Sequence, residues 1–319
     1  MDRHPTDLPY PPSTQAEPPG AAAEDSVLAV RPGVFDLRRP ARQALPLVLA
    51  SPHSGREYPS WFLALTSLDL ADLRRSEDCF IDEIFRPAAD RGAPLLSALF
   101  PRAFLDPNRE PFELDPAMFQ GTLPPYVNSR SARVQAGLGT IARIVAGGQS
   151  IYDAKLDFRE ATARLDTYYY PYHAALRRLV DGTVAAFGHC ILLDCHSMPS
   201  IGLPPEARAG AEIDIVLGDC HGSACAPAVI ATAEMVLRQQ GYSVARNAPY
   251  AGGYTTRHYG RPGDGVHALQ IEINRRLYME EVSFSRRPDL PLLAEHMVEL
   301  VEALGGVRPR RPGPAAAGR

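Results

Sequence analysis

Two histidines, each just after a run of aliphatic residues, are the side chains of this sequence best suited to chemistry. His53 follows residues 45–52, and His196 follows residues 190–194. Short apolar runs with polar boundaries are typical of buried strands in a parallel sheet, and functional groups gather at the carboxyl ends of such strands. Because neutral imidazoles are good zinc ligands, the pair predicts a metal site, although each histidine alone could equally be a structural residue at a strand end.

A third ligand should come from an acid or another histidine, since a catalytic zinc usually takes three protein ligands and one water. Three acids near His53 qualify, namely Glu57, Glu77 and Asp78. Asp78 is expected in the first turn of a helix capped by Ser76, where it could point back to the strand ends. Glu77 and Asp78 could equally serve only to compensate the helix dipole. Spacing alone leaves the three acids open.

Asp194 and Cys195 directly precede His196 and could share its site. Asp194 could bind the metal or orient an imidazole from behind. If the strand continues, Cys195 points to the opposite face from Asp194 and His196, which favours a buried, inert thiol. The competing hypothesis is a cysteine-dependent amidase that uses Cys195 with a histidine.

Glu272 is an acid within the apolar run 266–273, flanked by Ile271 and Ile273. A buried, unpaired carboxylate is very costly, so Glu272 must face either solvent or a site. Beside a metal it could take a proton from water as a general base. The alternative is a structural ion pair with Arg275.

Arg102, Asn108 and Arg109 surround a loop that two prolines exclude from any β-ladder. The planar guanidinium of arginine matches a carboxylate, so this loop could bind an acidic substrate. The simpler alternative is a local salt bridge with Glu110 or Glu113.

The elements that position these residues alternate between strands and helices. Besides the three runs above, strands are predicted at residues 94–100, 213–217 and 242–246. Helices are predicted over residues 76–92, 155–187 with a kink near Pro171, 228–240 and 291–304. Residues 247–265 form a long Gly- and Pro-containing loop, a kind of loop that is often functional. The alternation predicts an α/β fold with a mixed, mostly parallel central sheet flanked by helices.

The composition of all 319 residues fits one α/β domain at residues 29–306, with flexible tails at 1–28 and 307–319. The net charge of −4 gives no bulk attraction to nucleic acid or to an anionic membrane. No apolar run approaches the roughly 20 residues of a membrane span, and the N-terminus lacks an apolar signal core, so a cytoplasmic location is expected. Five cysteines without a CxxC pair indicate reduced thiols.

Over roughly residues 45–300 the chain resembles the N-formylglutamate amidohydrolase (N-formylglutamate deformylase) family. The resemblance rests on six motifs in one order: Ser51-Pro52-His53-Ser54-Gly55, Asp78-Cys79-Phe80-Ile81-Asp82, Asp106-Pro107-Asn108-Arg109, Asp194-Cys195-His196-Ser197-Met198, Asn247-Ala248-Pro249-Tyr250-Ala251-Gly252-Gly253 and His267-Ala268-Leu269-Gln270-Ile271-Glu272-Ile273-Asn274-Arg275.

The resemblance implies a phosphorylase/hydrolase-like α/β fold related to the zinc carboxypeptidases. It implies zinc-dependent hydrolysis of N-formyl-L-glutamate to formate and L-glutamate, late in histidine degradation. It selects Asp78 as the third metal ligand beside His53 and His196, and it makes Glu272 the general base.

For substrate binding, the resemblance implies that Asn108 and Arg109 hold a carboxylate, with Arg164 and Asn247 as weaker candidates. Pro107 stands where family members often have leucine, which stiffens this loop. Two related possibilities are a zinc amidohydrolase for another N-acyl amino acid and a carboxylate-binding homologue without catalysis.

Overall fold

The structure, a computed structural model, describes residue 28, residues 31–200 and residues 213–309. The two tails expected from the sequence lie outside these residues, except for residue 28 and residues 307–309. Within the described ranges, none of the helices combines the length and the apolar character needed to span a bilayer.

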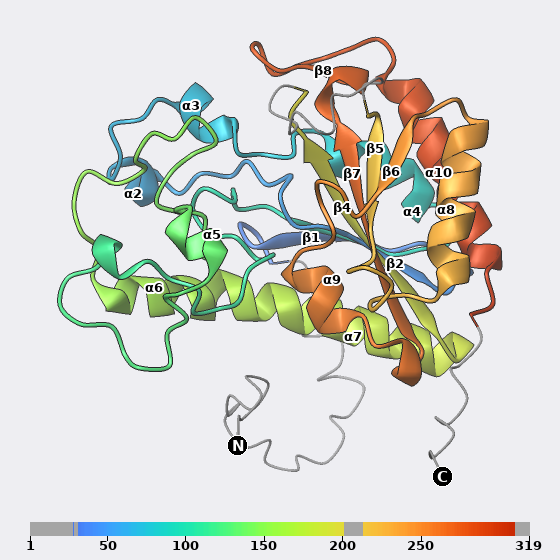
Figure 1. The fold of residues 1–319 in the computed structure, drawn as a ribbon, viewed down its shortest axis with the longest axis horizontal. Helices are drawn as coiled ribbons and strands as arrows, with labels where there is room; N and C mark the ends of the chain where they lie inside the picture. The colour runs from blue at the N-terminus through green and yellow to red at the C-terminus, as the bar shows by residue number, and fades with distance from the viewer. Residues whose placement is uncertain (1–27, 29–30, 201–212, 310–319) are drawn as a thin grey trace.

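A seven-stranded sheet in the order β1-β3-β2-β4-β7-β5-β6 forms the centre of the molecule (Figure 1). Its strands are β1 (Phe35–Arg38), β2 (Leu47–Ser51), β3 (Leu95–Ala98), β4 (Cys190–Met198), β5 (Ile215–Gly218), β6 (Val244–Arg246) and β7 (Val266–Asn274). β1 pairs antiparallel with β3, and β5 pairs antiparallel with β7. The other four pairings are parallel, which confirms the expected mixed, mostly parallel sheet.

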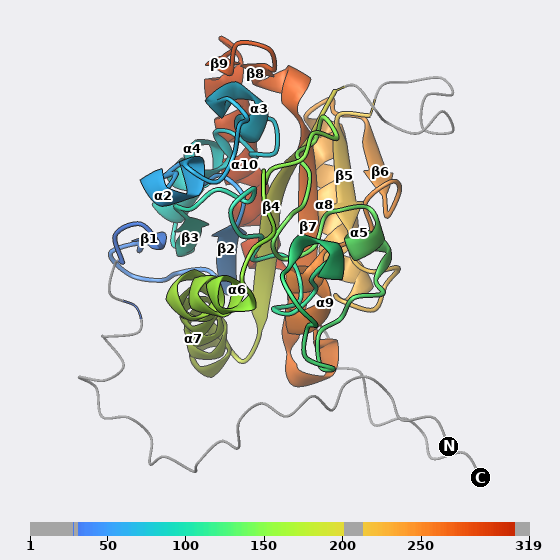
Figure 2. The same cartoon turned by 90° about the vertical axis from the view of Figure 1, so that its left-hand side faces the viewer.

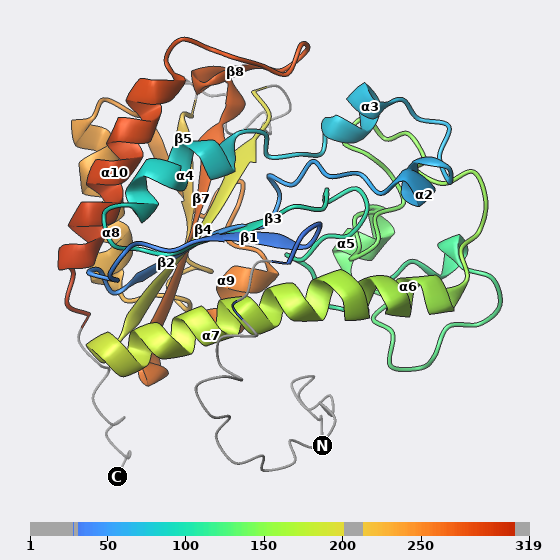
Figure 3. The same cartoon turned by 180° about the vertical axis from the view of Figure 1, so that it is seen from behind.

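Helices cover both faces of the sheet, because strands β2, β4 and β7 bury alternate side chains on each face. The helices of six or more residues in the described chain are α4 (Ile81–Ala89), α6 (Phe158–Arg164), α7 (Tyr170–Phe187), α8 (Pro227–Gln239), α9 (Tyr254–Tyr259) and α10 (Leu290–Gly306), and α6 extends beyond the sheet (Figure 3). α7 shares one hydrophobic core with Val48 and Leu192. α4, α8 and α10 share the other core with Leu49 and Leu193.

The long helical region expected at residues 155–187 is α6 and α7 joined by a π-helical turn, Leu165–Tyr169 (Figure 3). The interruption therefore precedes Pro171, which lies in the first turn of α7. Proline has no N–H to continue an α-helical ladder, and a wide turn before it accommodates the missing donor.

The loop predicted at residues 247–265 contains the short helix α9. Among the element boundaries that differ from the sequence prediction, two affect the site. The helix expected to start at Ser76 starts at Ile81, because Phe80 takes a left-handed conformation with φ 65°. Asp78 therefore lies in the loop before the helix. β4 does not end at residue 194 but pairs with β7 up to Met198, so His196 lies within the strand.

Residues 99–157 form a lobe beside the sheet with little regular structure, which the sequence did not predict (Figure 2). It contains α5 (Ala132–Gln135) and a short 3-10 turn, Pro116–Met118. Thr140 fixes two of its segments together, because Thr140 N donates to Glu113 O and Thr140 O accepts from Asp106 N, both at 2.8 Å.

Candidate active site

His53, Asp78 and His196 meet in a buried cluster whose potential ligand atoms all lie within 4.8 Å of one another. Asp78 Oδ2 is 3.3 Å from His53 Nδ1 and 3.0 Å from His196 Nδ1. His53 Nδ1 is buried and has no hydrogen-bond partner. Such an orphaned atom is costly unless something satisfies it, and a cation at this point would. The cluster can therefore hold a metal ion.

Asp78 is aimed at the two imidazoles by contacts to its other oxygen. Arg275 Nη2 lies 3.4 Å from Asp78 Oδ1, and Ser197 Oγ donates to the same oxygen at 3.3 Å. Asp78 N donates to His53 O at 2.9 Å, which ties the loop to the end of β2. Oδ2 is thereby presented to the histidines. Glu57 is exposed instead, and the buried Glu77 accepts hydrogen bonds from Tyr58, Arg74 and Cys79.

A carboxylate lies behind each imidazole. His53 Nε2 donates to Asp106 Oδ1 at 2.7 Å, and His196 Nε2 is 3.0 Å from Asp194 Oδ1. Asp194 thus takes the orienting position that the sequence had left open, while the matching role of Asp106 was missed. Carboxylates placed in this way fix the tautomer and orientation of metal-binding histidines.

The electrostatics of the cluster favour a cation. Burial would raise the pKa of Asp78, but its contacts with the imidazoles of His196 and His53 hold that pKa well below its ordinary value. Burial would lower the pKa of His196, but Asp194 and Asp78 raise it well above its ordinary value. The negative charges of Asp78 and Asp194 that stabilise a proton on His196 would stabilise a bound metal ion in the same way.

Glu272 lies beside this cluster, because β7 pairs it in register with His196 of β4. Burial, reinforced by nearby Asp78, raises the pKa of Glu272 to about 8. Its Oε1 accepts a hydrogen bond from Gln270 Nε2 at 2.8 Å. The alternative ion pair with Arg275 is wrong, because Arg275 bonds to Ser197 and to backbone carbonyls instead.

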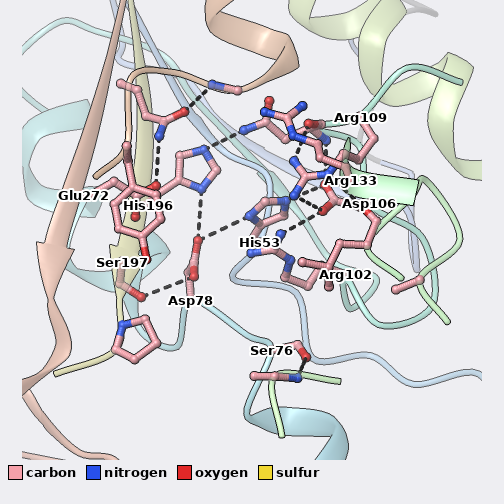
Figure 4. A pocket seen from close by; sticks show the side chains of 18 of the residues that line it. His53, Ser76, Asp78, Arg102, Asp106, Arg109, Arg133, His196, Ser197 and Glu272 are labelled. Carbon is pink, nitrogen blue, oxygen red and sulfur yellow. Dashed lines mark hydrogen bonds and ion pairs between the residues drawn. The ribbon is translucent and has the colours of Figure 1, made fainter. Parts of the chain in front are cut away.

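The cluster opens into a cavity of about 460 Å³ (Figure 4). Five arginines but only three carboxylates line it: Arg75, Arg102, Arg109, Arg133 and Arg275 against Asp78, Asp106 and Glu272. The excess of positive charge suits an anionic small molecule.

Asn108 and Arg109, the expected carboxylate-binding pair, both line this cavity. The Asn108 side chain is engaged on both sides, since Nδ2 donates to Asp194 Oδ2 and Oδ1 accepts from Thr255 N. Arg109 donates from Nε to Leu138 O and from Nη1 to Asn108 O. These contacts use two of its five N–H groups and leave others for a ligand.

The salt bridges proposed as an alternative for this loop do not form with Glu110 or Glu113 in the described part of the chain. Arg102 pairs instead with Asp106 at 2.8 Å, and Arg109 lies 3.7 Å from the same carboxylate. Together with His53, these arginines hold the pKa of Asp106 well below its ordinary value despite burial.

Two residues close to Pro171 in sequence form hydrogen bonds with the backbone of the loop that carries Asn108 and Arg109. Tyr169, in the π-helical turn, donates from its hydroxyl to Arg109 O at 2.8 Å. His173 Nε2 donates to Pro107 O at 2.9 Å. The chain thus anchors the backbone on both sides of Asn108.

The other two expected substrate residues, Arg164 and Asn247, do not line the cavity. Arg164 is buried against Phe104, whose carbonyl oxygen accepts a hydrogen bond from it. Asn247 organises a turn, because its side chain accepts from Asp219 N and donates to Asp219 Oδ1. These placements do not support substrate-binding roles.

Arg133 lines the cavity from α5 and was missed by the sequence analysis. Its segment has no clear hydrophobic period, so nothing in the spacing brought it toward the strand ends. Cys195 faces the opposite core, where burial raises the pKa of its thiol well above the ordinary value. That position confirms the predicted buried thiol and speaks against a cysteine nucleophile.

Comparison with known proteins agrees with this geometry. The model of the N-formylglutamate amidohydrolase family matches residues 45–279. An N-formylglutamate deformylase from Pseudomonas putida is 28% identical over 278 residues, which are 84% of this chain and 96% of that protein. The enzyme of the same name from Pseudomonas aeruginosa is 30% identical over 275 residues, which are 82% of this chain and 94% of that protein.

A solved structure gives the same result for the fold. The crystal structure of N-formylglutamate amidohydrolase from Ralstonia eutropha JMP134 superposes with a TM-score of 0.79 at 36% sequence identity, covering 86% of this chain and 97% of that one. The sheet, the buried cluster and these matches lead to one conclusion: the chain belongs to the N-formylglutamate amidohydrolase family.

Proposed function

We propose that this protein hydrolyses the N-formyl amide of N-formyl-L-glutamate to formate and L-glutamate, using a divalent metal held by His53, Asp78 and His196. The observation that carries the proposal is the buried His-Asp-His cluster beside Glu272 in an arginine-lined cavity. Family membership supplies the substrate, because the relatives are named for it. We infer zinc, because two imidazoles and one carboxylate are a ligand set that catalytic zinc takes.

When bound, the metal supplies Lewis acidity, which lowers the pKa of water and stabilises negative charge on oxygen. Glu272 takes a proton from the attacking water and later gives it to the leaving amine. Burial raises the pKa of Glu272 to about 8 without a metal, and the charge of a bound cation would lower it toward a value at which the group can both accept and release a proton. Arg102 lies within the field of Glu272 and Asp78, so its charge is available to the oxyanion.

Arg109 orients the substrate in this proposal, and Asn108, whose side chain already contacts His196 and Asp194, holds the loop in place beside the cluster. Arg109 keeps donors free for the α-carboxylate of the substrate, while its bonds to Leu138 O and Asn108 O fix the guanidinium. A guanidinium held in this way positions a carboxylate with little loss of entropy.

The test of the proton-transfer role is Glu272→Gln. We expect the variant to keep its metal and to lose formate release from N-formyl-L-glutamate by roughly 10²- to 10⁴-fold, because the amide cannot accept the proton. Formate is measured in an enzyme-coupled assay and metal by elemental analysis, with Glu280→Gln, at an exposed position, as the control. Loss of metal instead would mean that Glu272 is a ligand.

A panel of N-formyl, N-acetyl and N-succinyl amino acids, assayed before and after chelation, tests the substrate. Turnover of N-acetyl or N-succinyl compounds alone would favour the amidohydrolase for another N-acyl amino acid. Lack of any turnover with metal present would favour a carboxylate-binding homologue. A place late in histidine degradation rests on the family resemblance, and a cytoplasmic location stays a prediction from the sequence.

A further inference from the structure

Arg133 is a cavity-lining arginine that lacks a partner within the described ranges of the chain. No hydrogen bond or ion pair joins its guanidinium to another described residue, although it lines the same cavity as Arg109. Burial, together with the positive charges of Arg109 and Arg257, lowers the pKa of Arg133 to about 10. An arginine held in such surroundings gains from an anion that enters the cavity.

The nearby acids are already committed to other groups. Glu113 accepts a hydrogen bond from the hydroxyl of Ser131, the residue that caps α5. Asp106 accepts from His53 and pairs with Arg102. The charges of both acids still act on Arg133, but in the described part of the chain neither carboxylate forms a hydrogen bond or ion pair with it, so an anionic ligand would supply a direct partner.

The backbone of α5 is tied to the loop that carries Arg109. Ser131 Oγ accepts from Val134 N at 3.1 Å, which fixes the start of the short helix. Leu138 N donates to Arg133 O at 2.8 Å, and Leu138 O accepts from Arg109 Nε at 3.0 Å. The guanidinium of Arg109 and the backbone that carries Arg133 are therefore placed relative to each other before a ligand arrives.

Figure 4 shows Arg102, Arg109 and Arg133 together on the side of the pocket opposite Glu272. Glu272 acts on Arg102, the arginine of this group that also pairs with the carboxylate behind His53. The largest charge effects on Arg133 instead come from the positive charges of Arg109 and Arg257. The positive charge thus extends from the reacting end of the cavity toward its outer part.

We propose that Arg133 binds the side-chain carboxylate of the substrate and thereby selects acidic N-acyl amino acids, while Arg109 holds the α-carboxylate. The inference rests on the proposed function, because it assigns the second carboxylate of the same substrate. A dianion between the two arginines removes their mutual repulsion. A neutral amide at the same place leaves Arg133 desolvated and unpaired, and such a mismatch gives strong discrimination.

The experiment compares N-formyl-L-glutamate with N-formyl-L-glutamine, which has the same shape and one charge less. In Arg133→Met, kcat/KM for N-formyl-L-glutamate should fall by about 30-fold or more, mostly through KM. Turnover of N-formyl-L-glutamine should change little, so the ratio of the two kcat/KM values should fall strongly. Arg133→Lys should recover part of this ratio, because lysine restores the charge without the planar guanidinium.

Three controls keep the result interpretable. Arg130→Met removes an exposed arginine three residues earlier and outside the cavity, and should behave as the wild type. Metal content should be unchanged in every variant. Glutarate should inhibit the wild type better than butyrate, and Arg133→Met should lose this difference. If the methionine variant does not fold, the same experiment is done with Arg133→Gln.

The outcomes separate the two proposals. Wild-type turnover of N-formyl-L-glutamate with an undiminished glutamate preference in Arg133→Met and Arg133→Gln overturns the role of Arg133 and leaves the proposed function standing. Failure of the metal-loaded wild type to hydrolyse N-formyl-L-glutamate overturns the proposed function and this inference with it.

Discussion

Each imidazole of the metal cluster has two nitrogens with different tasks. Nδ1 of His53 and of His196 faces Asp78 Oδ2, while each Nε2 faces a carboxylate, Asp106 or Asp194. For His53 this arrangement leaves Nδ1 as the ligand atom, since Nε2 donates its proton to Asp106. For His196, Nε2 lies 3.0 Å from both Asp194 Oδ1 and Asn108 Nδ2, and Nδ1 is the nitrogen that faces Asp78. The carboxylates behind the histidines should therefore control metal affinity without touching the metal.

Asp106→Asn tests that expectation at the residue scale. The amide keeps the shape but loses the charge that orients His53 and pairs with Arg102, so affinity for zinc should fall by roughly 10- to 100-fold. Titration against a competing chelator measures the affinity, and Asp115→Asn, a partly exposed acid paired with Arg143, serves as the control. Equal zinc affinity in both variants would show that Asp106 has no such role.

The residues found from the sequence and those missed differ in where they lie. His53 and His196 stand out because they follow aliphatic runs. Glu272 stands out because burying an unpaired carboxylate between two isoleucines is costly. Asp106 lies on irregular backbone and Arg133 in the one-turn helix α5 of the same lobe, and the path of this lobe depends on long-range contacts such as Asp106 N to Thr140 O. No local period encodes such contacts, so spacing could not bring these residues to the site.

Among the elements, the buried strands were the easiest to predict and the lobe at residues 99–157 the hardest. β2, β4 and β7 are buried throughout and contain runs of aliphatic residues, so their hydrophobicity identifies the strands, although it does not show where β4 ends. The predicted start of α4 was wrong because Phe80 takes a left-handed conformation, and the helix begins only after it. A non-glycine residue gives no local sign of that conformation.

Helix α7 supports the loop that carries Asn108 through His173, a partly buried neutral histidine. Its Nε2 donates to Pro107 O, and its Nδ1 accepts from the hydroxyl of Tyr259 at 3.0 Å. Burial lowers the pKa of His173 from 6.5 to about 3. Between these two values the unfolded chain is protonated at this residue and the folded chain is not. His173 therefore makes the protein less stable as the pH falls below about 6.5.

Replacing His173 with glutamine should flatten the pH dependence of stability. The free energy of unfolding should lose its slope contribution of up to about 1.4 kcal/mol per pH unit between pH 6 and 4. Urea unfolding at a series of pH values measures the slope, whatever the variant's absolute stability. The control His221→Gln, at an exposed position, should keep the wild-type slope. An unchanged slope in His173→Gln would mean that this imidazole is charged in the folded protein.

At the scale of the whole molecule, the metal cluster joins parts of the chain that are far apart in sequence. His53 follows β2, Asp78 precedes α4, and His196 lies in β4. A metal that binds only the folded arrangement stabilises it by mass action, by about 4 kcal/mol at 1,000 times its dissociation constant.

Chelation should therefore lower the melting temperature by several degrees. Added zinc should restore the melting temperature, which scanning calorimetry measures. The recovery should follow the amount of zinc bound to the protein. His196→Ala should melt at a temperature that no longer depends on zinc. A chelator that removes the metal without moving the transition would contradict this role of the cluster.

The in-register pairing of His196 with Glu272 also limits how sequences of this fold can vary in length. Side chains alternate along a strand, so one residue inserted into the part of β7 that precedes Glu272 would turn this acid into the aliphatic core and bring an isoleucine to the metal cluster. Insertions are harmless only where the chain leaves the sheet. Evolutionary change in substrate preference is therefore expected to accumulate in the lobe at residues 99–157, while the strands that carry the chemistry keep a constant length.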